Sequence, residues 1–408
     1  MSESDQNSHS FQIFGSKQFK SDASFKEGEI ADALIQLRGA LRKAAWGNEE
    51  EFVKNKDSYK YEKGSGSLQK LTKDLILLAT RGYEFYTALI RDIAVQNQDT
   101  SPQAQVNALE DLMLEPGYVQ FVLQKGANHV LPLACLYDYP LDTGLPDFKL
   151  CSNFQEALKQ KQSLTLCSCF QGHCPSREDK STICPSGFWG YRHYLGMPQS
   201  IKFIHSSPAE IFYTDKPAFA ISVWKNFNSR ELHVKNLTSN KRVTWKYADD
   251  RASTLTILKD KNLHLVYFYC HGGAYPSYPY LEVGDNRNYK ITPSHINPNN
   301  GIYWEESHPL VFLNGCHTTG LSPERALNFV EAFVENALCA GVIGTEITIF
   351  ESLASDFFEF FIERFTQGDP VAKAVRDARL HILQQYNPLG LVYIPFVMGG
   401  LQLVKKAS

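Results

Sequence analysis

Two short stretches decide the fold of this chain: LHLVYFYCHGG at residues 263–273 and PLVFLNGCHT at residues 309–318. Each is a mostly apolar run that ends abruptly in small residues. Runs of this length are typical of buried strands in a parallel sheet, where catalytic groups gather at the carboxyl ends of the strands. The first run ends at His271 and the second at Cys316. The sequence therefore predicts that two neighbouring strands present an imidazole and a thiol together, as a Cys/His nucleophilic pair requires.

The composition is that of an ordinary soluble globular protein, with 408 residues, 43% hydrophobic and 21% charged. The net charge of −3 gives no electrostatic basis for nucleic-acid binding. No stretch approaches the ~20 apolar residues of a membrane span. Residues 1–27 are polar and lack the apolar core of a secretory signal, so we expect a disordered tail and a cytoplasmic protein. In a reducing compartment the nine cysteines are expected as free thiols, metal ligands or catalytic groups.

The chain divides into three further regions on its pattern of apolar residues. Residues 28–115 are predicted to be helical, with helices at 29–46, 68–95 and 103–114, and carry no catalytic signature. Residues 116–210 hold most of the cysteines, and we expect irregular structure with a few strands. Residues 211–404 alternate between strand and helix patterns, which predicts a mostly parallel sheet flanked by helices.

Within this last region the predicted elements follow one another closely. The expected strands are 219–224, 242–247, 263–269, 308–313, 341–347 and 391–398, and the expected helices are 229–237, 250–259, 322–339, 350–365 and 370–385. Ser322 is the expected N-cap of its helix, with Pro323 at the first position. Short segments at 280–283 and 289–292 are expected to form a β-excursion around Gly284 and Asp285.

A thiol nucleophile also needs backbone N–H donors for the oxyanion that forms during acyl transfer. Gly272 and Gly273 allow the backbone beyond His271 to turn sharply and approach a substrate, and Gly315 does the same before Cys316. We therefore expect the N–H groups of Gly272 and Cys316 to form the oxyanion hole.

These motifs resemble those of the CHAT-domain peptidases, a branch of the caspase-like (clan CD) cysteine proteases. That family typically has His-Gly at the end of one strand and a Leu-Ser-Ala-Cys-Glu-Thr-Gly-like sequence at the nucleophile. Here the second motif is LNGCHTTG at residues 313–320. The runs GVIGT at 341–345 and LPLACLYD at 131–138 are also similar to segments typical of these domains. The resemblance covers roughly residues 116–404.

The resemblance implies a caspase-like fold and a peptidase that cleaves a protein substrate through a thioester on Cys316, with His271 as general acid and base. Members of the family are commonly regulated by a partner or signal, often in prokaryotic (antiviral) defence or cell death. His317 replaces the usual Glu, Glu346 stands where an apolar pair is common, and the tandem helical repeats that often accompany the domain are not evident. The main alternative is a non-enzymatic interaction module on the same fold. A small-molecule-binding α/β domain would need a glycine-rich phosphate loop after the first strand, and residues 224–228 do not form one.

In the fold that the resemblance implies, substrate selection is expected at the ends of strands that flank the catalytic one. The candidates are Lys225 and Asn226 after the first strand, Asp285 in the excursion, and Glu346 after the run 341–345. An acidic floor at Asp285 or Glu346 would favour Lys or Arg in the substrate by charge pairing. The alternative is that these carboxylates are simply solvated.

The sequence also contains a cysteine cluster with the residue types of a structural zinc site. Zinc is usually held by four Cys or His ligands offered on turns. The expected ligands are Cys167, Cys169, Cys174 and Cys184, with His173 as a substitute; Cys151 lies upstream. The alternative is a set of free cysteines in an irregular region. No cofactor is expected for catalysis.

Overall fold

The computed structural model describes residues 8–14, 18–24, 29–53, 56–62, 64–96, 102–122, 130–199, 208–275, 278–285, 289–316 and 323–406. The chain forms two compact units. The first comprises Met1–Leu195 and Val375–Val392, and the second comprises Gly196–Ala374 and Tyr393–Ser408.

The second unit is built on a mostly parallel sheet. Its main strand order is β9-β8-β10-β13-β14-β15, in which only β15 is antiparallel to its neighbour. These strands are β8 (Ala218–Val223), β9 (Thr244–Ala248), β10 (Leu263–Tyr275), β13 (Leu310–Cys316), β14 (Gly341–Thr345) and β15 (Tyr393–Val397). Two antiparallel strands, β11 (Tyr278–Glu282) and β12 (Lys290–Ile291), extend the sheet from the distal part of β10. A separate parallel pair joins β7 (Glu210–Tyr213) to β16 (Gln402–Lys405).

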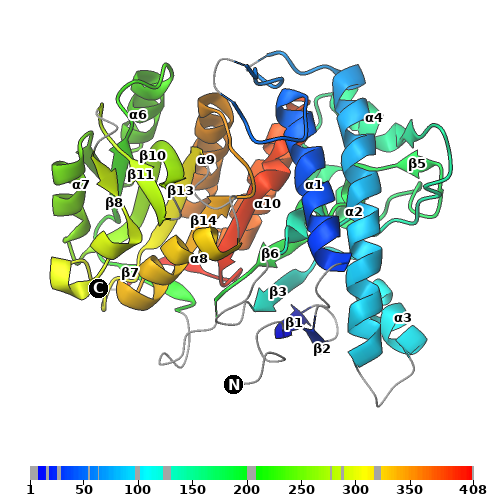
Figure 1. Cartoon of the computed structure of the whole chain (residues 1–408), viewed down its shortest axis with the longest axis horizontal. Helices are drawn as coiled ribbons and strands as arrows, with labels where there is room; N and C mark the ends of the chain where they lie inside the picture. The colour runs from blue at the N-terminus through cyan, green and yellow to red at the C-terminus, as the bar shows by residue number, and fades with distance from the viewer. Residues whose placement is uncertain are drawn as a thin grey trace. The chain divides into compact units, whose positions relative to one another are not determined.

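Helices cover both faces of this sheet, as Figure 1 shows. Successive residues of β10 point to opposite faces, so Tyr267 and Phe268 identify the two layers. The Tyr267 ring stacks on Phe358 of α9 (Glu351–Thr366) at 3.5 Å and contacts His233 of α6 (Arg230–Thr238). Phe268 contacts Phe333, which lies in the π-helical turn after α8 (Pro323–Glu331). The same layer contains α7 (Arg251–Leu258), whose last carbonyl accepts a hydrogen bond from the Trp304 indole.

This architecture confirms the predicted α/β fold with its mostly parallel sheet, and one boundary corrects the sequence-based expectation. The strand β10 does not turn at Gly272 and Gly273 but continues to Tyr275 in a hairpin with β11. A Cβ at Gly273 would lie 2.6 Å from the Tyr280 hydroxyl, so the absent side chain leaves room for Tyr280. Gly273 therefore permits close packing within a hairpin rather than a turn. The expected N-cap Ser322 lies outside the described residues.

The first unit begins with a difference from the prediction. Residues 1–27 were expected to be disordered, yet β1 (Ser8–Phe14) and β2 (Gln18–Ser24) form an antiparallel hairpin. This hairpin joins β3 (Tyr118–Val122) and β6 (Tyr194–Gly196) in one sheet. The polar composition of residues 1–27 led to the prediction of disorder. Around Phe11 and Ile13, however, polar and apolar residues alternate, which is the pattern of a strand.

The predicted helices of this unit are confirmed as α1 (Glu29–Trp46), α2 (Leu68–Gln96) and α3 (Pro102–Leu112). The following segment is irregular, as expected. Its regular elements are β4 (Lys149–Leu150), α4 (Ser152–Lys159), β5 (Thr182–Ile183) and α5 (Trp189–Arg192). Within the first unit, α10 (Val371–Gln384) contributes Arg376, whose buried guanidinium donates to the carbonyls of Tyr191 and Phe170. Such bonds satisfy carbonyls of short helical turns, whose last carbonyls have no partner within the turn.

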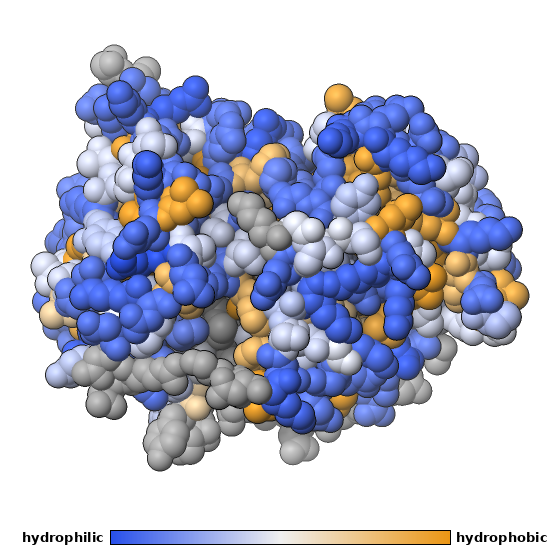
Figure 2. Space-filling model, turned by 90° about the horizontal axis from the view of Figure 1, so that it is seen from above, coloured by the Kyte–Doolittle hydropathy of each residue, from blue (hydrophilic) through white to orange (hydrophobic). Residues whose placement is uncertain are grey.

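Among the described residues, no helix combines the length and apolar character needed to cross a membrane. The face drawn in Figure 2 is largely hydrophilic, and its apolar residues form patches separated by polar ones.

Candidate active site and cysteine cluster

The two residues singled out by the sequence are register partners in the sheet. His271 of β10 lies opposite Cys316 of β13, at the last pair of these parallel strands. On its other side His271 pairs with Glu282 of β11, and Glu282 pairs with Lys290 of β12. Because neighbouring strands lie about 4.8 Å apart, these positions form one row across four strands. We call Cys316, His271, Glu282 and Lys290 the cross-strand row.

The row lies where the strand order of the sheet reverses. From β8 the chain passes through α6 to β9 on one side, whereas from β10 it continues to β13 on the other. Ligands of open α/β sheets bind outside the carboxyl ends of the strands at such a point. The segment after β8 and the distal part of β10 are therefore the expected place for a substrate.

The His271 ring is half-buried against two aromatic side chains from the segment after β8. Its ring centre lies 5.4 Å from that of Trp224 and 4.8 Å from that of Phe227. The backbone of this segment is fixed on both sides. The Trp224 N–H donates to the Tyr269 carbonyl at 2.8 Å, and the Lys225 N–H donates to the Gly284 carbonyl at 2.7 Å. These bonds hold the aromatic pair against the imidazole.

Partly buried hydrogen bonds also fix β10 two residues before His271. The Tyr269 hydroxyl lies 2.8 Å from the Ser229 hydroxyl, and both reach Glu351 at the start of α9. The Glu351 carboxylate accepts from the N–H and the hydroxyl of Ser229, each at 2.9 Å. Burial raises the pKa of Tyr269, so its hydroxyl stays neutral and available as a donor.

The corresponding position on β13, two residues before Cys316, is held in the same way. The Asn314 side chain is buried and donates to the Tyr267 hydroxyl at 3.1 Å and to the Ala354 carbonyl at 2.7 Å. Its carbonyl oxygen accepts from the Tyr393 hydroxyl at 2.9 Å. Asn314 thus links β10, β13, β15 and α9 in one network, which fixes the register of the two strands.

Of the expected oxyanion-hole residues, Gly272 lies one residue beyond His271 on β10, opposite Leu281 of β11, and Cys316 is the last residue of β13. His317 lies outside the described residues.

The expected substrate-binding residues differ in exposure. Asp285 has a side chain 65% exposed, and its carboxylate lies 3.9 Å from the Lys225 ammonium. Asn226, next to Lys225, is also exposed. Glu346 is only 1% exposed and follows β14, two strands away from β10 in the sheet. The structure therefore brings the segments of Asn226 and Asp285 together. Glu346 does not join them, because it is buried just after the carboxyl end of β14.

In the first unit, four cysteines converge. The sulfurs of Cys151, Cys169, Cys174 and Cys184 all lie within 4.8 Å of one another, and all four residues are buried. This group, which we call the four-Cys cluster, could hold a metal ion. It differs from the predicted set because Cys151 takes the place of Cys167; His173 is exposed. In the sequence Cys151 lies upstream of the other cysteines, and nothing there favours it over Cys167 as a ligand. The parallel pairing of β4 with β5, which precedes both Cys151 and Cys184, cannot be read from a local pattern.

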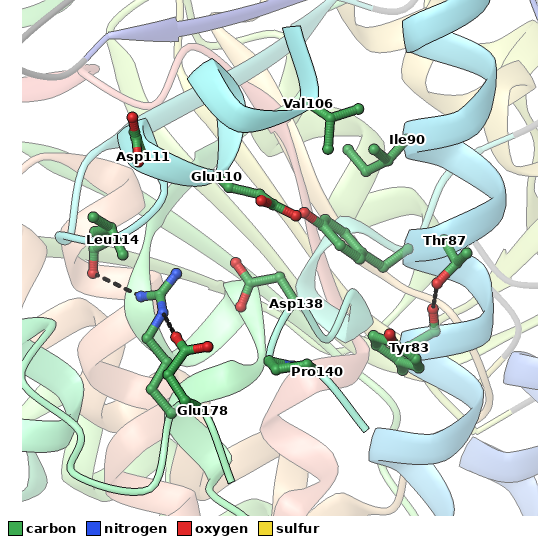
Figure 3. Close-up of a pocket in the computed structure, with 12 residues that line it drawn as sticks. Tyr83, Thr87, Ile90, Val106, Glu110, Asp111, Leu114, Asp138, Pro140 and Glu178 are labelled. Carbon is green, nitrogen blue, oxygen red and sulfur yellow. Dashed lines mark hydrogen bonds and ion pairs between the residues drawn. The ribbon is translucent and has the colours of Figure 1, made fainter. Parts of the chain in front are cut away.

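The first unit also has a cavity of about 560 Å³. It is lined by Tyr83, Tyr86, Thr87, Ile90, Val106, Glu110, Asp111, Leu114, Asp138, Pro140, Arg177 and Glu178 (Figure 3). Burial, together with nearby Asp138, raises the pKa of Glu110. The lining includes neither Cys nor His, so it offers no Cys/His pair of the kind predicted from the sequence.

No protein-family model matches the chain. Over 424 aligned residues the chain is 38% identical to a protein of Vitiosangium sp. (strain GDMCC 1.1324) that is named a probable protease. The alignment covers 100% of this chain and 54% of that protein, so the chain spans about half the length of this curated relative.

Proposed function

We propose that this chain carries a cysteine endopeptidase site of the caspase-like type, with Cys316 as nucleophile and His271 as general acid and base. The observation that carries the proposal is the register pair of His271 and Cys316 at the reversal of strand order. The relative named a probable protease supports peptidase activity in general. The resemblance of the two strand-end motifs to CHAT-domain peptidases supports the cysteine mechanism.

The proposed reaction proceeds through an acyl-enzyme. The Cys316 sulfur attacks the carbonyl carbon of the scissile peptide bond while His271 accepts the thiol proton. Backbone N–H groups, for which Gly272 and Cys316 are the proposed donors, stabilise the tetrahedral oxyanion. His271 then gives its proton to the leaving amine, and a thioester remains on Cys316. A water molecule, deprotonated by His271, attacks the thioester and releases the new carboxyl end with a free thiol.

Glu282 is proposed as a positioning residue for His271. It is buried and occupies the opposite position on β11, and directly opposed residues of an antiparallel pair point to the same face with Cβ atoms about 5 Å apart. A carboxylate there favours one orientation of the imidazole and stabilises its protonated form, as the acidic member of a catalytic triad does. Trp224 and Phe227 restrict the ring from the other side.

For substrate recognition, Asp285 is a stronger candidate than Glu346. Asp285 is exposed beside the segment that packs on His271, whereas Glu346 is buried. A basic residue before the cleaved bond could take over the partner role of Lys225, and we therefore propose a preference for Lys or Arg.

Regulation by a protein partner or signal, in a setting such as prokaryotic defence or regulated cell death, is proposed from the family resemblance alone. No direct binding to nucleic acid or to a membrane is proposed.

Cleavage of a proteome-derived peptide library, read by mass spectrometry, tests the proposal. The wild-type chain is compared with Cys316→Ala and with Cys339→Ala, a matched control at a buried cysteine of the same unit. Cuts by the wild type and the control, absent with Cys316→Ala, are the expected result; a shift away from Lys and Arg in Asp285→Asn would identify the recognition residue. Equal cutting by Cys316→Ala would refute the proposed nucleophile. If no protein cuts, also after addition of fractionated lysate, the chain is better described as an interaction module.

A further inference from the structure

We infer that the four-Cys cluster is a structural zinc site whose ligands are Cys151, Cys169, Cys174 and Cys184. The inference concerns the first unit and does not depend on the proposed peptidase site.

The spacing of the sulfurs matches one tetrahedral metal ion. Four Zn–S bonds of about 2.3 Å, directed to the corners of a tetrahedron, place the sulfurs about 3.8 Å apart. The Cys151 sulfur lies 3.9 Å from that of Cys169 and 4.0 Å from that of Cys174. A disulfide would need about 2.05 Å. An iron–sulfur cluster distributes its thiolates over several iron atoms, which a group confined to 4.8 Å does not accommodate.

The ligands come from turns that long-range backbone contacts hold in place. Cys151 precedes α4, and its N–H donates to the Ile183 carbonyl at 2.9 Å, which sets it beside Cys184 at the end of β5. Cys169 lies in a 3₁₀ turn that ends at Gly172, where φ is +92°. A Cβ at Gly172 would lie 2.8 Å from the Leu114 carbonyl, so glycine is required there both for its backbone angle and for space. The turn at Gly172 brings Cys174 back towards Cys169.

The surroundings supply what a buried thiolate site needs. The Ser186 hydroxyl lies 3.1 Å from the Cys184 sulfur and can donate to it. The Ser186 carbonyl accepts from the fully buried Arg192 guanidinium, which also pairs with Asp138. A hydrogen bond to a ligating sulfur reduces the cost of burying thiolates around one divalent ion, and the Arg192 guanidinium fixes the backbone of Ser186, which donates that bond.

A structural role follows from the weak secondary structure around the site. The two strands nearest to it, β4 and β5, contain two residues each, and residues 172–181, which lead from the 3₁₀ turn to β5, form neither helix nor strand. Segments with so few ladder hydrogen bonds are commonly fixed by disulfides or metals, and metal binding then contributes directly to folding. All four ligands are protein side chains, so no position remains open for catalysis.

The first test is the metal content of the full chain purified under reducing conditions without added metal, by inductively coupled plasma mass spectrometry. We expect about one zinc ion per chain, released on titration of the thiols with a mercurial reagent. Cys151→Ser should lower the zinc content at least fivefold, whereas Cys167→Ser, the matched control, should retain it.

The second test measures amide hydrogen exchange of the wild-type chain with and without a chelator. It needs no variant, so it does not depend on whether Cys151→Ser folds. Chelation of the wild type should accelerate exchange first between residues 149 and 192. The inference is overturned if the purified chain, also after refolding with excess Zn²⁺, holds no zinc, if it holds iron, or if mass spectrometry finds disulfides among the four cysteines. Loss of zinc from Cys167→Ser with retention in Cys151→Ser would overturn the assigned ligand set. None of these outcomes bears on cleavage by Cys316.

Discussion

The two units place cysteine in contrasting surroundings. In the first unit four thiols are buried within 4.8 Å of one another, and a serine hydroxyl lies 3.1 Å from one of them. In the second unit Cys316 ends a strand opposite a half-buried imidazole, at the point where the strand order reverses. A thiol surrounded by other ligands is suited to holding an ion, whereas a thiol at a strand end beside a base is suited to reaction with a substrate. The arrangement of the partners, rather than the residue type, distinguishes the two proposed roles.

Among the changes that would separate the proposed roles of the two units, the largest effect is expected from substitution of His271. His271→Ala should lower kcat/KM for a cleaved peptide by about 10²- to 10⁴-fold, because proton transfer to and from Cys316 and the leaving amine is lost. Zinc content and melting temperature should stay close to those of the wild type. His295→Ala, a second partly buried histidine of the same unit, is the control. Cleavage within threefold of the wild type would remove His271 from the mechanism.

A second prediction contrasts ion pairs in the two units. The Asp138–Arg192 pair is almost completely buried, and Asp138→Ala should lower the free energy of unfolding by about 3–5 kcal/mol because Arg192 would be left buried and unpaired. The Lys225–Asp249 pair is a third exposed, with 3.7 Å between its charged atoms, and Asp249→Ala should cost less than about 1 kcal/mol. Chemical denaturation of the full chain measures both; similar costs would contradict the burial argument.

Thiol footprinting should separate the two kinds of cysteine. In the native chain, iodoacetamide should alkylate Cys316 on the order of 100-fold faster than the four-Cys cluster, because a thiol that reacts only after a local opening of about 3 kcal/mol is slowed by that factor. After chelation the cluster should become reactive while Cys316 is unchanged. Peptide mapping by mass spectrometry gives the rates, and a cluster that is alkylated as fast as Cys316 before chelation would argue against its protection.

The smallest expected effect is a pH dependence in the second unit. Burial lowers the pKa of His264, whose ring accepts from the Ala218 N–H and lies 3.0 Å from the Phe212 carbonyl. Below about pH 6.5 the unfolded chain binds a proton that the folded chain does not, so stability falls as the pH falls. His264→Gln should flatten this dependence. Melting curves between pH 5 and pH 8 test it, and an unchanged slope in the variant would assign the dependence to other groups.

The sequence by itself determined the α/β alternation of the second unit and the position of His271 and Cys316 at the ends of two buried runs. These features are local, because strand length, apolar character and the order of the motifs are properties of neighbouring residues. The helices α1, α2 and α3 were predictable for the same reason, since their apolar spacing repeats within each helix.

Only the tertiary structure decided which residues meet. Cys151 rather than Cys167 completes the four-Cys cluster because a backbone bond to Ile183 sets its position, and Glu282 comes opposite His271 because β10 continues into a hairpin. The strands near the N-terminus depend on pairing with β3, far along the chain, and the burial of Glu346 contrasts with the exposure of Asp285. Each of these outcomes is set by contacts between segments distant in sequence, whose energies a local pattern does not record.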